Sequence, residues 1–260
     1  MAAEPDGPIL GGPSLDGPSL DGPSLDGPGL DGPGLDGPGL DGPRLEPREG
    51  AARQLVVFLH GYGADGNDLI EIGRAWQGLL PHAAFASPHA PDPCGQMPTG
   101  RQWFPLASRD VNERWNGVSH AAPALQRFLD RELARRNLPP SALAIVGFSQ
   151  GTMLALHVGL RCTVAPFAVV GYSGALVVPQ DVEPEAIAGE ITSRPPVLLV
   201  HGDRDDVIPV QALFQASGGL ASFDVPTEWH ISGGIGHGID QEGLRHGGEF
   251  LNRAIARKKP

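Results

Sequence analysis

Residues 142–151 read Ala-Leu-Ala-Ile-Val-Gly-Phe-Ser-Gln-Gly, and this stretch decides how the rest of the chain is interpreted. An apolar, β-branched run ends in Gly147-Phe148-Ser149-Gln150-Gly151, and a run with helical character follows over residues 152–161. The turn is so tight that a side chain two residues before or after the serine would collide with it. Glycine, which has no side chain, stands at both positions and permits the turn. The pattern predicts a strand, a sharp turn and a helix, with the hydroxyl of Ser149 exposed at the tip.

A G-x-S-x-G sequence between a strand and a helix is the nucleophile elbow of α/β-hydrolases, so we expect Ser149 to be a catalytic nucleophile. The pentapeptide alone is weak evidence, because glycine and serine are common residues. An ordinary glycine-rich turn is the alternative interpretation.

Strand and helix patterns alternate along the body of the chain. Wholly apolar strands that alternate with helices predict a mostly parallel sheet covered by helices on both faces, so the expected fold class is α/β, an α/β-hydrolase fold. Reactive groups gather at the carboxyl ends of the strands in such sheets. Expected strands cover residues 54–60, 83–87, 143–148, 167–172, 197–201 and 227–231; expected helices cover 68–80, 110–137, 152–161, 210–220 and 241–256; a loop covers 88–108.

A five-residue repeat fills residues 8–47, with three Pro-Ser-Leu-Asp-Gly units followed by three Pro-Gly-Leu-Asp-Gly units. Proline and glycine in every unit oppose a regular helix or a central strand. One leucine per unit buries too little apolar surface to offset the ordering entropy. We expect residues 1–47 to be a disordered acidic tail and residues 48–260 to be the α/β-hydrolase domain; a stacked β-solenoid is the structured alternative. Deletion of the tail is expected to leave turnover nearly unchanged.

The composition limits which classes of binding partner we expect. The formal net charge is −11 at pH 7, and eight of these negative charges lie in residues 1–42. No basic patch suits a nucleic acid, and no apolar run suits stable membrane insertion. The first residues lack a secretory signal, so the expected compartment is the cytoplasm. Cys94 and Cys162 lie far apart without metal-type spacing, so neither a metal site nor a disulfide framework is expected. A homodimer is left open.

The serine needs two partners. A serine hydroxyl is a poor nucleophile until a base takes its proton, and the base needs an orienting acid. In α/β-hydrolases the acid and then the histidine follow the serine along the chain. Three candidate acids, Asp203, Asp205 and Asp206, follow a late predicted strand. The expected base is His237, because its glycine-rich surroundings let the imidazole move between nucleophile and leaving group.

The other histidines have settings that favour structural roles. His60 and His201 end predicted strands beside glycine, and His157 lies within the predicted helix after the serine. The rest stand in loop, strand or helix positions without a glycine-rich setting.

An acyl-transfer site also needs two backbone donors for the oxyanion. One is the amide of Gln150, directly after the nucleophile. The other is expected from the loop after the first strand of the body, where the amide of Tyr62 lies between two glycines that allow the backbone to turn inward.

Several short blocks of sequence follow one another between about residues 53 and 258, and their order is more specific than any one block. The blocks are 58–65, 88–91, 103–104, 147–151, 201–209 and 236–237. Together they resemble the phospholipase/carboxylesterase family of serine hydrolases, which includes acyl-protein thioesterases and bacterial carboxylesterases. The resemblance implies hydrolysis of small-molecule ester or thioester bonds through an acyl-serine intermediate, without a cofactor.

The resemblance also assigns residues. It places the acid at Asp205, four residues after His201, although Asp206 stands where relatives often have proline. Asp206 is therefore the first alternative and Asp203 the second.

The loop that holds Met97, Trp103 and Phe104 resembles the family's substrate-side flap, and we expect these side chains to line an acyl groove. The alternative is a loop whose two aromatic residues pack in the core.

Rival functions remain. A lysophospholipase or an acyl-protein thioesterase is the nearer alternative, and a non-catalytic binding module that uses the repeat tail is a distant one. A dienelactone-hydrolase-type enzyme would normally have cysteine in the place of Ser149. A prolyl peptidase would normally need an extra domain, for which the body has no room.

Overall fold

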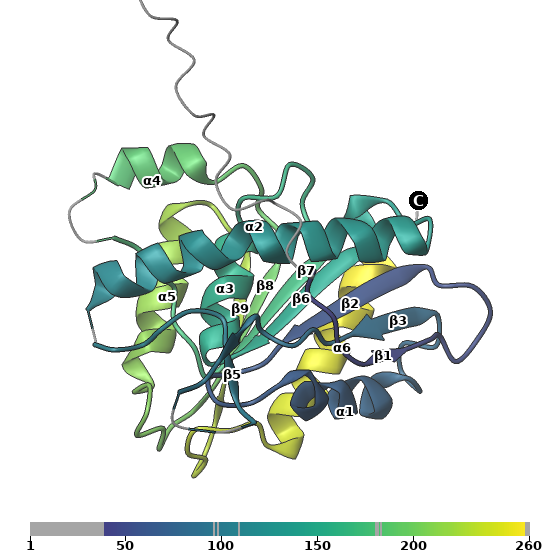
Figure 1. The fold of residues 1–260 in the computed structure, drawn as a ribbon, viewed down its shortest axis with the longest axis horizontal. Helices are drawn as coiled ribbons and strands as arrows, with labels where there is room; N and C mark the ends of the chain where they lie inside the picture. The colour runs from purple at the N-terminus through teal and green to yellow at the C-terminus, as the bar shows by residue number, and fades with distance from the viewer. Residues whose placement is uncertain are drawn as a thin grey trace, which may run out of the picture. The chain divides into compact units, whose positions relative to one another are not determined.

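The computed structural model describes residues 39–257 except 96, 98, 109, 180, 181 and 183, and a seven-stranded sheet runs through this part of the chain (Figure 1). The first strand in the sheet is antiparallel to its neighbour and the others are parallel. From edge to edge the strands are β1 (Arg44–Leu45), β3 (Ala83–Ala86), β2 (Gln54–Leu59), β6 (Leu143–Phe148), β7 (Ala168–Tyr172), β8 (Val197–Gly202) and β9 (Thr227–Ser232).

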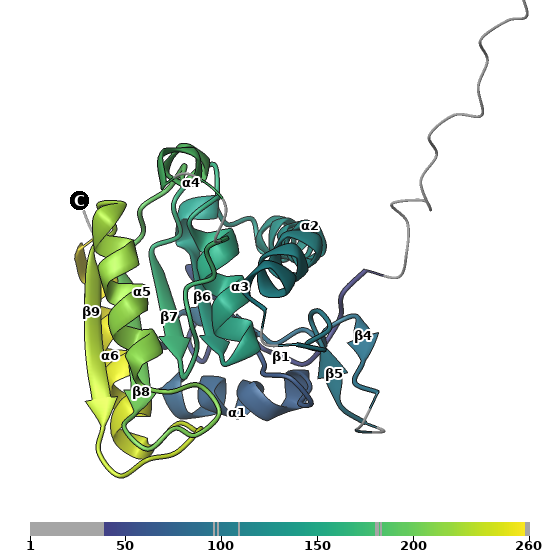
Figure 2. The same ribbon diagram turned by 90° about the vertical axis from the view of Figure 1, so that its left-hand side faces the viewer.

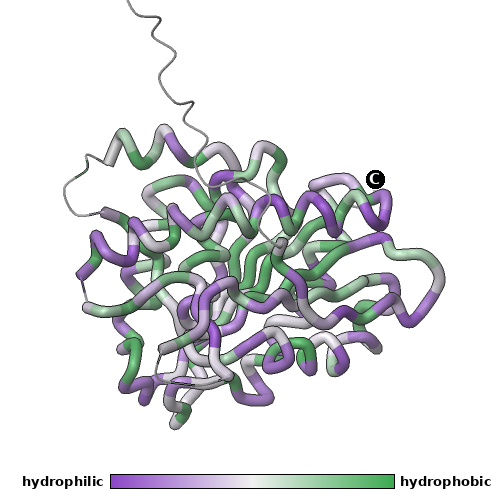
Figure 3. Tube along the Cα trace, in the orientation of Figure 1, coloured by the Kyte–Doolittle hydropathy of each residue, from purple (hydrophilic) through white to green (hydrophobic). Residues whose placement is uncertain are grey.

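Helices cover both faces of the sheet (Figure 2). One face carries α2 (Val111–Arg135), α3 (Gln150–Gly159) and α5 (Gln211–Ser222), and the other carries α1 (Gly66–Trp76) and α6 (Gln241–Arg257). Alternate side chains of β2 enter the two buried clusters, because successive residues of a strand point to opposite faces. Both faces are covered, so the central strands are almost wholly apolar (Figure 3).

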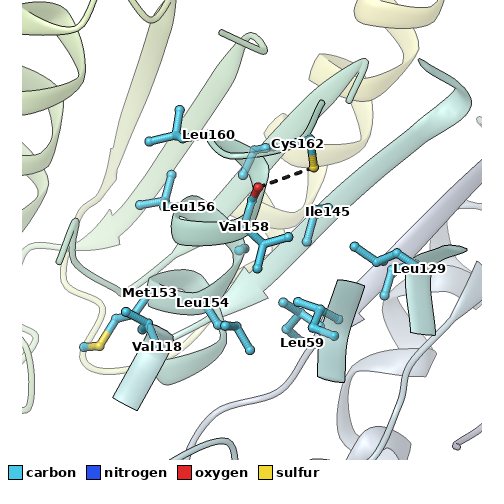
Figure 4. Packing of buried hydrophobic residues seen from close by; sticks show 14 of the residues in the cluster. Leu59, Val118, Leu129, Ile145, Met153, Leu154, Leu156, Val158, Leu160 and Cys162 are labelled. Atoms are coloured by element: carbon cyan, nitrogen blue, oxygen red, sulfur yellow. Dashed lines mark hydrogen bonds between the residues drawn. The ribbon is translucent and has the colours of Figure 1, made fainter. Parts of the chain in front are cut away.

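The turn that holds Ser149 rests on a densely packed support. Helix α3 is buried along its whole length, so its side chains pack on both the sheet and α2. Figure 4 shows Met153, Leu154 and Leu156 of this helix in one cluster with Leu59 of β2 and Ile145 of β6. Closely packed protein interiors resist movement, so this packing holds the tip of the turn in place.

The fold class and all expected strands and helices are confirmed, with ends that differ by a few residues. Five short elements were not expected. They are β1, the antiparallel hairpin of β4 (Asp92–Pro93) and β5 (Arg101–Gln102), the 3-10 helix η1 (Pro140–Ala142), and α4 (Pro184–Glu190). The hairpin lies within the stretch expected to be loop. No helix in the described part of the chain combines the length and apolar character of a membrane span.

The folded domain begins earlier than the expected boundary after residue 47. Leu40 packs against the core, and the carbonyl oxygens of Asp41 and Pro43 accept hydrogen bonds from His89 and Ser87 at 2.8 and 3.0 Å. Strand β1 then pairs with β3. Residues 39–47, the end of the repeat, thus belong to the folded domain, whereas residues 1–38, which carry the rest of the repeat, lie outside the described residues.

Candidate active site

Ser149 lies at the junction of β6 and α3 with φ 53° and ψ −115°, a strained conformation for a residue other than glycine. Its amide donates a hydrogen bond to the carbonyl oxygen of Tyr172 at 2.9 Å. A Cβ on Gly151 would overlap the carbonyl oxygen of Leu59, and a Cβ on Gly147 would overlap that of Gly151. Both glycines are therefore required by close backbone approach, and the geometry is that of a nucleophile elbow.

His237 and Asp205 form a direct contact, with 2.7 Å between Nδ1 and Oδ2. The carboxylate can only accept here, so Nδ1 carries the hydrogen and Nε2 has a free lone pair. The other carboxylate oxygen, Oδ1, accepts from the amides of Val207 at 2.9 Å and Ile208 at 2.8 Å. The Asp205 side chain is fully buried, whereas that of His237 is 17% exposed.

Burial alone would raise the pKa of Asp205. The hydrogen bonds from His237 and from the amides of Ile208 and Val207 outweigh it and hold that pKa below its usual value of 3.8. Asp205 is therefore an anion at neutral pH, able to stabilise a charged imidazole.

The two alternative acids lie elsewhere. Asp203 is exposed and accepts a hydrogen bond from the amide of Gly234 at 2.6 Å. Asp206 is also exposed. Of the three aspartates, only Asp205 meets the imidazole of His237.

Two contacts bring the loop of His237 to the elbow. The ring of Phe148, the residue before the serine, lies 5.0 Å from the ring of His237 between centroids. The hydroxyl of Ser173 donates to the carbonyl oxygen of Gly238 at 3.3 Å. The residue before Ser173 accepts from the amide of Ser149, so the loop of His237 lies beside the elbow.

The loop after β2 approaches the serine closely. A Cβ on Gly61 would lie 3.4 Å from the Cβ of Ser149, so this loop can come near only because glycine stands there. Tyr62 follows, and Gln150 begins α3. Among the described residues, neither the amide of Tyr62 nor that of Gln150 has a hydrogen-bond acceptor, so both are available to an oxyanion.

The side chain of Gln150 has a role that the sequence did not suggest. Its Oε1 accepts from the amide of Trp103 at 2.9 Å, and its Nε2 donates to the carbonyl oxygen of Phe104 at 2.7 Å. The indole of Trp103 in turn donates to the carbonyl oxygen of His60 at 2.9 Å. This buried network joins α3, the segment after β5 and the loop after β2. In the sequence, the only sign of this network was a glutamine next to the proposed nucleophile.

His60 completes this network as a neutral ring. Its Nδ1 donates to the carbonyl oxygen of Gly61 at 2.8 Å, and its Nε2 accepts from the amide of Ala90 at 3.0 Å. Burial lowers the pKa of His60, which keeps the ring uncharged at neutral pH. This placement agrees with the structural role expected for it.

The flap residues differ from one another. Trp103 and Phe104 are each only 1% exposed and belong to the core, so they do not line an open groove; the alternative of core-packed aromatics describes them. Their apolar surface is already used against neighbouring side chains. Met97 is 52% exposed and lies against Gly63, and Tyr62 is 39% exposed. Both are exposed apolar side chains, on the segments that follow β2 and β4.

Comparison with known proteins gives a consistent result. The model of the phospholipase/carboxylesterase family matches residues 40–255. Acyl-protein thioesterase 1 of Gibberella zeae is 24% identical over 215 residues, which cover 78% of this chain and 91% of that protein. Esterase YpfH of Escherichia coli is 26% identical over 204 residues, which cover 78% of this chain and 84% of that protein.

Solved structures show the same relationship. Esterase PE8 superposes with a TM-score of 0.78 and 43% identity, over 83% of this chain and 99% of that one. SOBER1 of Arabidopsis thaliana superposes with a TM-score of 0.66 over 78% of this chain and 100% of that one; at 23% identity it supports the fold alone. The chain belongs to the phospholipase/carboxylesterase family of hydrolases, whose members act on ester or thioester bonds.

Proposed function

We propose that the protein is a serine hydrolase that cleaves carboxylic ester or thioester bonds through an acyl intermediate on Ser149. The 2.7 Å contact between His237 and Asp205 is the observation that carries this proposal, because it leaves Nε2 of the imidazole free to accept a proton. The strained serine supplies the hydroxyl from which that proton comes. All proposed roles are filled by protein groups, without a cofactor.

The reaction follows from this arrangement. Nε2 of His237 takes the proton of the Ser149 hydroxyl as the oxygen attacks the carbonyl carbon. The amides of Tyr62 and Gln150 bind the oxyanion of the tetrahedral intermediate. Its collapse expels an alkoxide or thiolate, which takes the proton from His237. Water then loses a proton to His237 and attacks the acyl carbon. Collapse of this second tetrahedral intermediate releases the carboxylic acid, and the oxygen of Ser149 takes the proton back from His237.

The substrate class is a small-molecule ester or thioester. Met97 and Tyr62 offer exposed apolar surface beside the serine, which suits an acyl chain. We propose that Trp103 and Phe104 act indirectly, as the buried floor that fixes these loops. An acyl-protein thioesterase or a lysophospholipase is the second candidate, supported by the thioesterase from Gibberella zeae.

The experiment measures turnover of p-nitrophenyl acetate, butyrate, octanoate and palmitate by the wild type, Ser149→Ala and Ser222→Ala. Ser222 is exposed at the end of α5 and serves as the matched control. Hydrolysis that disappears in Ser149→Ala and persists in Ser222→Ala supports the proposal. A preference for acetate or butyrate indicates a carboxylesterase, and a preference for long chains indicates the second candidate. Turnover that survives in Ser149→Ala contradicts the proposal.

A further inference from the structure

Strand β9 is an edge strand of the sheet and lies beside α6 (Figure 2). Glu228 accepts from Arg253 of α6 at 2.7 Å, and Ser232 bonds the aspartate that precedes the helix. His230 lies between them on the same face, and its ring packs against that of His246 of α6 at a tilt of 34°, with ring centroids 4.1 Å apart. Two imidazoles are thus held together by two separate elements.

A carboxylate completes the group. Glu242 lies one helical turn before His246, so both point from the same side of α6. One ligand atom from each of His230, Glu242 and His246 lies within 4.8 Å of the other two. The Glu242 Oε1 and His246 Nε2 atoms are 3.8 Å apart. Two ligand atoms on a tetrahedral zinc ion are about 3.3 Å apart, so small side-chain rotations would close the set.

One ligand already lacks a partner. The Nε2 atom of His230 is buried and has no hydrogen-bond partner among the described residues. Buried polar atoms are nearly always paired, so this nitrogen indicates a missing ligand. Two imidazole nitrogens and one carboxylate oxygen are a donor set that zinc-class ions prefer.

A competing cation lies at the same place. Arg245 Nη2 is 3.4 Å from His246 Nε2 and 3.7 Å from Glu242 Oε1. Its Nη1 already donates to both carboxylate oxygens of Glu249, at 3.0 and 3.1 Å. The guanidinium can therefore turn toward Glu249 and leave the site to a metal ion.

We propose that His230, Glu242 and His246 bind a divalent transition-metal ion of the zinc class, with water in the remaining coordination position. The ion would join β9 to α6, and these two elements hold the ends of the loop over residues 233–240 that carries His237. This departs from the expectation of no metal, which rested on cysteine spacing alone. The site is separate from the proposed chemistry at Ser149 and would stabilise the edge of the fold.

The test titrates Zn²⁺ into the untagged, chelator-treated full chain by calorimetry. We expect one ion per chain, with binding at least about tenfold weaker in His230→Ala and in His246→Ala, since even outer-shell changes cost that much. His120→Ala, an exposed histidine in α2, and His237→Ala should bind as the wild type does. Arg245→Ala should bind roughly two- to fivefold more tightly, because a competing surface cation is removed.

A second readout is thermal. Saturating Zn²⁺ should raise the melting temperature of the wild type by roughly 5 °C and leave that of His246→Ala unchanged. The His246 side chain is 31% exposed, so this variant is expected to fold, as circular dichroism would verify. The proposal is overturned if no ion binds or if His230→Ala and His246→Ala bind like the wild type. It is also overturned if only His237→Ala loses binding, which would place the ion at the active site proposed around Ser149.

Discussion

Replacement of Asp205 by asparagine isolates what this carboxylate does. Asparagine keeps an oxygen in the place of Oδ1, so the amides of Val207 and Ile208 at 2.9 and 2.8 Å keep their acceptor and the fold should persist. Its amide nitrogen then faces Nδ1 of His237, which lies 2.7 Å from Oδ2 in the wild type. Two hydrogen-bearing nitrogens cannot share that contact, so the imidazole is driven to carry its hydrogen on Nε2.

A histidine in that tautomer cannot take the proton of Ser149. We expect kcat to fall by about 10³- to 10⁴-fold, or roughly 4–5.5 kcal/mol of transition-state stabilisation, with little change in KM. Initial rates with p-nitrophenyl butyrate measure both constants, and melting temperature monitors the fold. Asp206→Asn is the matched control, because its side chain is exposed one position away. Retention of more than about a tenth of kcat in Asp205→Asn, or an equal loss in Asp206→Asn, would refute the reasoning.

Three further predictions concern the support of the site. Arg44→Met removes hydrogen bonds of 2.9 and 3.0 Å to the buried carboxylate of Glu132, and should cost about 2–3 kcal/mol in urea unfolding at pH 7, whereas the exposed Arg48→Met should cost under about 0.5 kcal/mol. Burial opposes ionisation of Glu132 but its arginine partners lower its folded pKa, so this cost should shrink as the pH falls below 4.5 and the carboxyl protonates. Gln150→Leu should lower kcat by roughly 10²-fold in the same ester assay, because the loops around the serine lose their tie. Deletion of residues 1–38 should leave kcat/KM unchanged, while a deletion that extends past Arg44 should also lose stability as Arg44→Met does.

The main sheet could be predicted because its strands are long and buried. The apolar runs that became β2, β6 and β8 are six residues each, and each is bounded by turn residues. Strands β1, β4 and β5 have two residues each, too few to show a period. They form because tertiary neighbours offer hydrogen-bonding partners, as β3 does for β1.

The site was predictable where local sequence constrains it. Ser149 and His237 were proposed from the glycines around them. The choice between Asp205 and Asp206 was not decidable from local sequence, because adjacent carboxylates in one turn point in different directions that only the folded turn determines. Burial of Trp103 was likewise out of reach, since an indole suits a groove and a core equally well.

Long-range contacts were also out of reach. Arg44 meets Glu132 across 88 positions of the chain, so the folded role of the last repeat unit could not be inferred from the composition of the repeat.

The most direct test of the central claim is mass spectrometry of the intact chain after reaction with a fluorophosphonate, followed by peptide mapping. We predict a single adduct per chain, located on Ser149, and a much slower reaction in His237→Ala. No adduct should form on Ser149→Ala, while Ser222→Ala should label as the wild type does. An adduct on another residue, or labelling of Ser149 that is unaffected by His237→Ala, would contradict the account.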